Sequence, residues 1–423
     1  VIGLRKTLHE ETFMDKPDLV AVNAVKTWNR LREEIDGWPD IVLSRPPRKK
    51  EPWTIPLDQF PQLFQDDVER WIQRLEHPDP LDISAPRKPL RPATVKHRLH
   101  QIQQAATAAV LSKHMPVAEL QSLAVLVDIA TFKAILRFLM GRFGDKPTEA
   151  IHGLAVGLKA IAQYHVDVAP GHAEELKQIC DRINLKVDGL RVKNQQRLEQ
   201  LEDPHNLAAL LHLPEKLVRL SKRGDLRDHK MALLVQAALG IEVLLYAPMR
   251  AGTLSSLHLE NHIRFIGSGR RRVTQITVPA AEVKNDRDLH YELGPESTKL
   301  LEQYIRDARP ILMRQPTEYL FPAQNGGHKR AEHVSGQIKR TILEHTGMVI
   351  NAHLFRSIAG KIHSLMAPGD FVTLSHVLHN TLQTAMRHYA QFEHKSSIRH
   401  YQNSVDRARQ NLMSPDQGRK RKS

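Results

Sequence analysis

Helical periodicity is the pattern that most limits how this chain can fold. Apolar residues recur every three or four positions in segments near residues 18–35, 63–75, 94–112, 118–126, 129–143, 148–164, 207–221 and 226–246. Residues 271–279 and 289–293 instead alternate apolar and polar side chains, as strands with one buried face do. Residues 280–288 would be the hairpin connection between them. The sequence therefore predicts a mainly α protein with a small antiparallel β-sheet.

The length and the charge pattern predict several domains. A chain of 423 residues is too long for one efficient core. Residues 44–50 form a proline-containing basic linker, and closely spaced charges up to Glu202 indicate an exposed helix and a second linker. We expect an N-terminal segment with its linker at 1–50, a helical domain at 51–200, a second domain at 201–412 and a basic tail at 413–423. The tail would either bind DNA non-specifically or act as a solubilising end.

The charge balance predicts a polyanionic partner. The formal net charge of +14 favours nucleic acid, although an anionic membrane surface or ribosomal RNA is compatible with the same number. Gln236 and Glu242 interrupt the longest apolar stretch, and no secretion signal is recognisable, so we expect a cytosolic protein without a membrane span. The single cysteine, Cys180, excludes an internal disulfide and a cysteine cluster for zinc.

One helix in the first half carries a basic start. Thr94 follows a proline-rich lead and is the expected N-cap of this helix. Arg91, Lys96 and Arg98 lie around its first turns, where basic side chains and free backbone N–H groups suit a DNA phosphate. The alternative is a charged face that only contacts solvent.

Four separated stretches in the second half supply groups that suit phosphoryl transfer. Arg250 follows an apolar helix that ends at Pro248, although an arginine there could simply pair with a carboxylate. Lys284 lies in the expected hairpin connection, where its ammonium could protonate a leaving 5′ oxygen or merely face solvent. His353 and Arg356 are three residues apart on a helical turn, so both can face one phosphate.

The fourth stretch contains Leu378-His379-Asn380 and, nine residues after Asn380, Tyr389. These four stretches, in this order, resemble the tyrosine recombinase or phage integrase family. The resemblance covers residues 205–400 and, more weakly, 51–200. It implies a helical core-binding domain followed by a mixed α/β catalytic domain.

The resemblance also implies an activity and a partner. Members of the family cut and rejoin double-stranded DNA at specific sites by transesterification, without a cofactor, a metal or an external energy source. They assemble as tetramers on two DNA sites and often pass a C-terminal segment to a neighbour. Residues 392–412 would be that segment in this chain.

By the same resemblance, Tyr389 would be the nucleophile that forms a 3′-phosphotyrosine. Arg250 and Arg356 would hold the non-bridging oxygens, His353 would assist proton transfer or position the phosphate, and Lys284 would be the general acid. Tyr401 is a rival nucleophile, but it lacks the preceding motif.

Two positions depart from the family pattern. Glycine is usual where His379 stands and histidine where Asn380 stands, so either residue could fill the second-histidine role. Thr253 stands where the family often has an acidic residue. These departures leave open a DNA-binding regulator that has lost catalysis. A topoisomerase IB-like or telomere-resolving enzyme is a third alternative.

Overall fold

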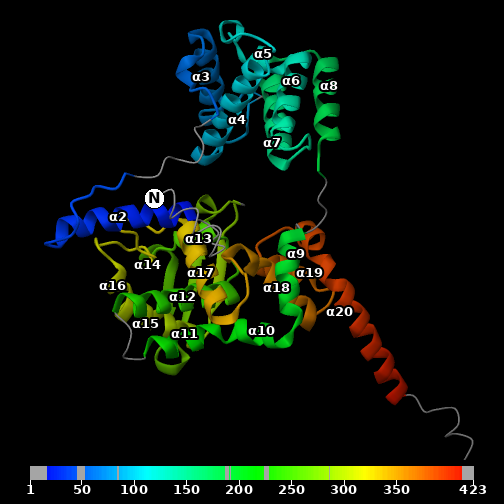
Figure 1. Ribbon diagram of the computed structural model, residues 1–423. Coiled ribbons are helices and arrows are strands. Elements are labelled where there is room, and N and C mark those ends of the chain that lie inside the picture. Colours follow the sequence, from blue (N-terminus) through cyan, green and yellow to red (C-terminus); the bar gives the residue numbers. More distant parts are fainter. Residues whose placement is uncertain are drawn as a thin grey trace, which may run out of the picture. The chain divides into compact units, whose positions relative to one another are not determined.

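The computed structural model describes residues 17–44, 53–82, 85–185, 190, 192–222, 228–284 and 286–411 (Figure 1). The chain divides into two compact units, Val1–Lys186 and Val187–Ser423. The expected boundary near residue 200 falls inside the second unit, because Leu198 and Leu201 are buried in that unit's core. The expected linker, apart from Ser44, and the basic tail lie outside the described residues.

The first unit opens with α2 (Pro17–Glu34), close to the expected helix. The chain turns at Gly37, whose φ of 83° is one that glycine adopts without strain. Trp38 then packs edge-on against Trp28, with ring centroids 5.2 Å apart. Asn29 exchanges two hydrogen bonds of 2.9 Å with the backbone of Leu43, which hold the returning segment alongside α2.

The rest of the first unit is a helical bundle around its own apolar core. Its helices are α3 (Gln62–Glu76), α4 (Pro92–Leu111), α5 (Leu123–Val127), α6 (Ile129–Gly141), α7 (Glu149–Ile161) and α8 (Pro170–Arg182). Helix α4 packs against both α6 and α7. Its buried alanines allow this close approach, because four of them, Ala105, Ala106, Ala108 and Ala109, have no exposed surface.

Two sequence expectations for this unit were wrong. Thr94 does not cap α4, which begins at Pro92 with Arg91 in the N-cap position; proline suits the first helical turn because it has no N–H to satisfy. The helix expected at 118–126 is two short pieces, η2 (Val117–Glu119) and α5.

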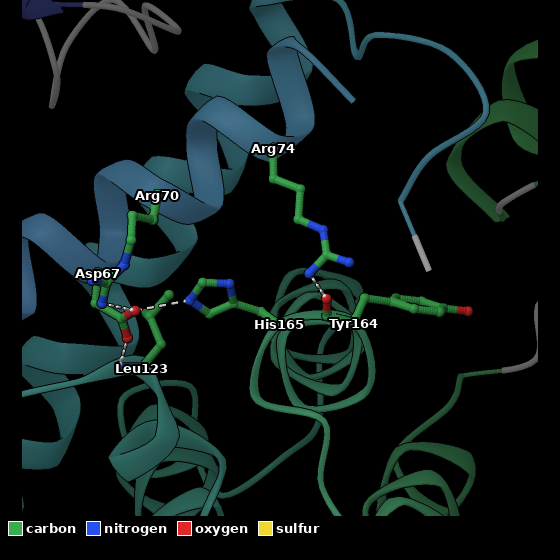
Figure 2. Close-up of polar contacts among 6 residues, drawn as sticks. All are labelled: Asp67, Arg70, Arg74, Leu123, Tyr164 and His165. Carbon is green, nitrogen blue, oxygen red and sulfur yellow. Dashed lines mark hydrogen bonds and ion pairs between the residues drawn. The ribbon is translucent and has the colours of Figure 1, made fainter. Parts of the chain in front are cut away.

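A buried carboxylate joins three parts of the bundle (Figure 2). Asp67 of α3 is 7% exposed and accepts hydrogen bonds from Arg70 and from the backbone N–H of Leu123, and it pairs with His165 at 2.9 Å. His165 lies in η3 (Ala162–Val166), a π-helical turn that extends α7. Burial opposes the ionisation of Asp67, but these three partners outweigh it and lower its pKa.

The second unit is built around α12 (Asp228–Tyr246), which packs against α11 (Leu213–Ser221), α15 (Pro295–Gln303) and α17 (Ala331–Thr346). Among the described residues α12 is the one helix long and apolar enough to cross a membrane. More than half of it is buried inside this unit, as expected of a core helix. The helix expected at 207–221 is interrupted at His212, between α10 (Pro204–Leu211) and α11.

A three-stranded antiparallel sheet covers part of this core. The strands β1 (Ile263–Ile266), β2 (Val273–Val278) and β3 (Leu289–Leu293) pair in the order β1-β2-β3. The alternation of β2 buries Thr274, Ile276 and Val278. The pair β2 and β3 matches the expected strands, whereas β1 was missed because four residues are too few to show alternation. The expected fold class, mainly α with a small antiparallel sheet, is confirmed.

The remaining elements of the second unit include those that position the candidate site. They are α9 (Val192–Glu199), η4 (Gln200–Glu202), α13 (Ala251–Ser255), α14 (Leu259–His262), η5 (Gly269–Arg271), η6 (Ala280–Glu282), η7 (Tyr304–Ala308), α16 (Arg309–Leu312), η8 (Ala352–Leu354), α18 (Phe355–Met366), α19 (Phe371–Val377) and α20 (Leu382–Asn411). Two isolated bridges lie outside the strands of the sheet, His258 with Tyr319 and Pro322 with His328.

The buried carboxylate makes the stability of the first unit pH-dependent. Asp67→Asn should lower its free energy of unfolding at pH 7 by about 2 kcal/mol, because a hydrogen-bonded charge is lost. The folded pKa lies below 3.8, so this contribution is complete above that value and disappears as the pH falls through the folded pKa. Hydrogen exchange of α3 peptides in the full chain, at pH 7 and in acid, measures it. Asp66→Asn, at an exposed position, is the control; equal effects of the two substitutions would contradict the assignment.

Candidate active site

Arg356 lies at the centre of the candidate site. It is near the start of α18 and only 7% exposed. Its Nη1 donates to the carbonyl of Pro248 at 2.8 Å, and its Nη2 donates to the carbonyl of Leu378 at 2.7 Å and to Oδ1 of Asn380 at 3.0 Å. All three acceptors are neutral. These bonds therefore fix the guanidinium without neutralising its charge, which remains able to attract an anion.

Arg250 lies beside Arg356. It is the N-cap residue of α13 and follows directly on the segment whose Pro248 carbonyl accepts from Arg356. Burial lowers the pKa of Arg250, and the positive charge of Arg356 lowers it further. Two partly desolvated cations side by side repel each other, and a bound phosphate would relieve that repulsion. Thr253, in the position of the missing acidic residue, is buried within α13.

The turn between α19 and α20 separates the roles of His379 and Asn380. His379 has a φ of 48°, the left-handed conformation that glycine adopts without a steric cost. Its backbone therefore occupies the place that a glycine would take, while Asn380 directs its side-chain oxygen to Arg356. The side chain of Asn380 accepts a hydrogen bond from Arg356, while burial and, to a smaller extent, the charge of Arg356 lower the pKa of His379.

Tyr389 is brought to the same arginine by α20, which packs on α18 and α19. Its side chain is buried at 5% exposure in a small cluster with Leu374, Leu378 and Ala385. Burial raises the pKa of Tyr389, whereas Arg356, Arg250 and a hydrogen bond from Arg356 act to lower it; burial prevails. The hydroxyl is therefore protonated at neutral pH and lies against the guanidinium of Arg356.

Gly360 makes room for the Tyr389 ring. A Cβ atom at this position of α18 would lie 2.5 Å from Cδ1 of Tyr389, closer than real Cβ contacts occur. The lack of a side chain at Gly360 thus sets how deeply the tyrosine enters the site.

The structure also brings His353 and Lys284 to this group. Partial burial lowers the pKa of His353, and the positive charges of Arg356, Arg250 and Lys284 lower it further, so the imidazole is neutral at pH 7. His353 nevertheless keeps an exposed surface, as does Lys284.

Contacts before and after Lys284 in the sequence hold the connection between β2 and β3 in place. Val283 is buried at 1% exposure, and the backbone N–H of Ala280 donates to Asp288 at 2.7 Å. Nε2 of the buried His262 lies 3.2 Å from a carboxylate oxygen of Glu282. These contacts restrict the backbone next to an otherwise flexible lysine.

One residue at the site was missed by the sequence analysis. Tyr291 of β3 interacts electrostatically with both arginines, and its ring meets that of His379 edge-on at 4.9 Å. Tyr291 lies two positions from Leu289 and two from Leu293, which are both buried. The period of two along a strand therefore places its ring on the same inner face, and this spacing was the available signal in the sequence. The rival tyrosine, Tyr401, is 69% exposed farther along α20.

A cleft of about 700 Å³ opens beside these residues. Tyr291, His379 and Asn380 line it together with Tyr246 and the start of α20. Among the described residues no cluster of three or more histidine, cysteine or acidic side chains could hold a metal ion.

The basic start of α4 belongs to the first unit. Arg91, Thr94 and Lys96 are exposed there, as a phosphate-binding surface requires. Arg98 differs, because its Nη1 donates to Gln101 at 2.9 Å and lies where a Cβ on Gly157 would be only 2.8 Å away. Its burial against α7 lowers its pKa.

A comparison with protein families assigns the second unit. The model of the phage integrase family matches residues 203–395, a range that contains Arg250, Arg356 and Tyr389. The second unit of this chain belongs to the phage integrase family. The resemblance seen over residues 205–400 is thereby confirmed, and we refer to Val187–Ser423 as the integrase unit. No curated protein matches the chain.

Solved structures similar to the chain share little sequence with it. The XerH site-specific recombinase bound to difH substrate, in a pre-cleavage complex, is 14% identical; 75% of this chain and 90% of that chain are covered, with a TM-score of 0.43. A lambda integrase dimer bound to a COC′ core site is 13% identical, with 78% and 76% covered and a TM-score of 0.44. The integrase from mycobacterium phage Brujita is 17% identical, with 79% and 92% covered and a TM-score of 0.28.

The close fit between the Tyr389 ring and Gly360 in the integrase unit can be tested by adding a side chain at Gly360. Gly360→Ala should force the tyrosine ring outward and lower the free energy of unfolding by about 1–3 kcal/mol, as overpacking does. Tyr389 should then react faster with tetranitromethane, measured by peptide mass spectrometry. Gly336→Ala in α17 is the control, because a Cβ there meets nothing within 4 Å. Unchanged nitration of Tyr389 in Gly360→Ala would contradict the close fit.

Proposed function

We propose that this protein is a site-specific DNA recombinase that breaks and rejoins double-stranded DNA through a 3′-phosphotyrosine at Tyr389. The observation that carries the proposal is the position of the Tyr389 hydroxyl, buried against Arg356 beside Arg250. A nucleophile and two cations for one phosphate are what a transesterification needs. The energy of the broken phosphodiester bond is conserved in the phosphotyrosine bond, so no external energy source is required.

The reaction follows from these groups. The Tyr389 oxygen attacks the scissile phosphorus, a new P–O bond forms, and the bond from phosphorus to the 5′ oxygen breaks. Lys284 gives a proton to that leaving oxygen, and the tyrosine proton passes to His353, whose lowered pKa keeps it neutral and able to accept. Attack by a 5′-hydroxyl reverses every step and rejoins the strand.

The two arginines stabilise the transition state electrostatically. Negative charge grows on the non-bridging oxygens as the five-coordinate phosphorus forms, and guanidinium groups placed beforehand meet that charge without reorganisation. Asn380 contributes through its bond to Arg356, not through proton transfer, because an amide does not titrate. Its role is therefore to hold the arginine in place.

The DNA partner and the assembly follow from the same reaction. The net charge of +14 and the exposed Arg91, Thr94 and Lys96 on α4 suit the backbone of double-stranded DNA, with Arg98 supporting that surface from its partly buried position. Exchange between two duplexes cuts four strands, and each chain supplies one Tyr389. We therefore propose a tetramer on two DNA sites, acting on DNA inside the cell.

The nucleophile can be identified without knowing the DNA target. The protein is incubated with a pool of nicked duplexes of random sequence, and DNA that stays attached on a denaturing gel is sequenced. Wild type and Tyr401→Phe should form the adduct, Tyr389→Phe should form none, and Arg356→Ala should lose about 100-fold or more in rate.

Other results would point to the alternative functions. DNA binding without any adduct favours a regulator that has lost catalysis. Adduct formation with supercoil relaxation but no strand exchange favours a topoisomerase-like enzyme.

The general acid can be separated from the other groups with a modified substrate. Lys284→Ala should slow cleavage of the captured duplex about 100-fold, because the 5′ oxygen leaves unprotonated. Sulfur in place of that oxygen leaves readily without a proton, so the variant should cleave this duplex at nearly the wild-type rate. Lys299→Ala, at an exposed lysine of α15, is the control. An equal defect on both substrates would rule out a proton-donor role for Lys284.

A further inference from the structure

The hydroxyl of Tyr291 is a buried polar group to which the structure gives no hydrogen-bond partner. A buried, unsatisfied hydroxyl destabilises the folded protein. A phenylalanine would keep the packing of this ring without burying an unsatisfied hydroxyl, so the hydroxyl lowers the stability of the free protein. At a candidate active site, a buried hydroxyl without a partner indicates a ligand that accepts its hydrogen bond.

The surroundings of Tyr291 identify the chemistry of that ligand. Burial raises the pKa of Tyr291 to about 12, even though Arg356 and Arg250 act to lower it. The hydroxyl is therefore neutral at physiological pH and can donate a hydrogen bond beside two cations. A group that accepts from a hydroxyl and also attracts two guanidiniums is an anionic oxygen, and in the proposed reaction it is a phosphate oxygen.

The position of the ring is fixed on two sides. Tyr291 belongs to β3, which is paired with β2 along its length, for example at Ile276. The ring of His379 packs against it edge-on at 4.9 Å. The hydroxyl is therefore held in place before any ligand binds, and donors placed in advance stabilise developing charge most effectively.

We propose that Tyr291 donates a hydrogen bond to a non-bridging oxygen of the scissile phosphodiester and is a further catalytic residue of the integrase unit. The inference rests on the proposed function, because it assigns the phosphate to the site of Arg250 and Arg356. Tyr291 is not the nucleophile: its hydroxyl keeps its proton throughout and forms no covalent bond.

The first experiment uses inorganic phosphate as the probe and needs no DNA. Binding to the full chain is titrated by ³¹P NMR. Tyr291→Phe should weaken it about tenfold, as the loss of one hydrogen bond to a charged group does, while Tyr389→Phe should change it less. Tyr246→Phe is the matched control, because Tyr246 lines the same cleft but is 60% exposed. Equal affinities of wild type and Tyr291→Phe would overturn the proposal.

Thermal unfolding without phosphate distinguishes this role from a structural one. Tyr291→Phe should melt at the wild-type temperature or above, since it removes an unsatisfied buried hydroxyl. A lower melting temperature would mean that the hydroxyl has a partner inside the protein, and would overturn the inference. Stability retained together with weaker phosphate binding is the expected combination.

The last experiment places the contact on the substrate. On the captured duplex at a saturating concentration of protein, Tyr291→Phe should lower the rate of adduct formation about tenfold. A methylphosphonate that replaces the contacted oxygen should abolish the difference between variant and wild type, whereas the opposite stereoisomer should retain it. A difference retained on both isomers would overturn the contact. If Tyr389 proves not to be the nucleophile, the phosphate titration still decides the role of Tyr291.

Discussion

The candidate site depends on a buried guanidinium held by neutral oxygens. Arg356 is almost inaccessible, and its three acceptors come from the segment after α12 and from the turn before α20. A carboxylate partner would make the guanidinium cheaper to bury, but it would also compete with the phosphate for its charge. Carbonyl and amide oxygens satisfy its N–H groups and leave the charge in place. The backbone thus fixes the cation, and the substrate is left to neutralise it.

This arrangement explains how one turn can accommodate the sequence Leu378-His379-Asn380. The carbonyl of Leu378 and the amide of Asn380 must reach the same Nη2 atom, which requires the chain to reverse between them. The reversal is made at His379, in a left-handed conformation that costs a non-glycine residue about 1 kcal/mol. The contact of the His379 ring with Tyr291 offsets part of that cost. A position that normally favours glycine therefore also supports the ring of a neighbouring residue.

Much of this could be predicted from the sequence, because it depends on local patterns. Periodicity gave the helices and two strands, and the spacing of His353 and Arg356 predicted that they share a face. Other features depend on contacts between distant segments. The choice between His379 and Asn380 required the φ of one residue, and Thr94 failed as a cap because Pro92 begins α4 earlier. Neither Gly360 under the Tyr389 ring nor the inward position of Tyr291 belongs to a recognisable motif.

The electrostatics of the site keep the Tyr389 hydroxyl protonated. Tyr389 is buried, so its proton is hard to remove, and the neighbouring arginines lower its pKa too little to overcome that effect. A bound phosphodiester would neutralise the charge of the arginines and so reduce their lowering of the Tyr389 pKa. The phenolate therefore does not form before the attack on phosphorus. In the proposed reaction, proton transfer would then accompany attack, with His353 as a neutral acceptor near a cationic cluster. The cluster meets that requirement itself, because the charges that bind the phosphate also lower the pKa of His353.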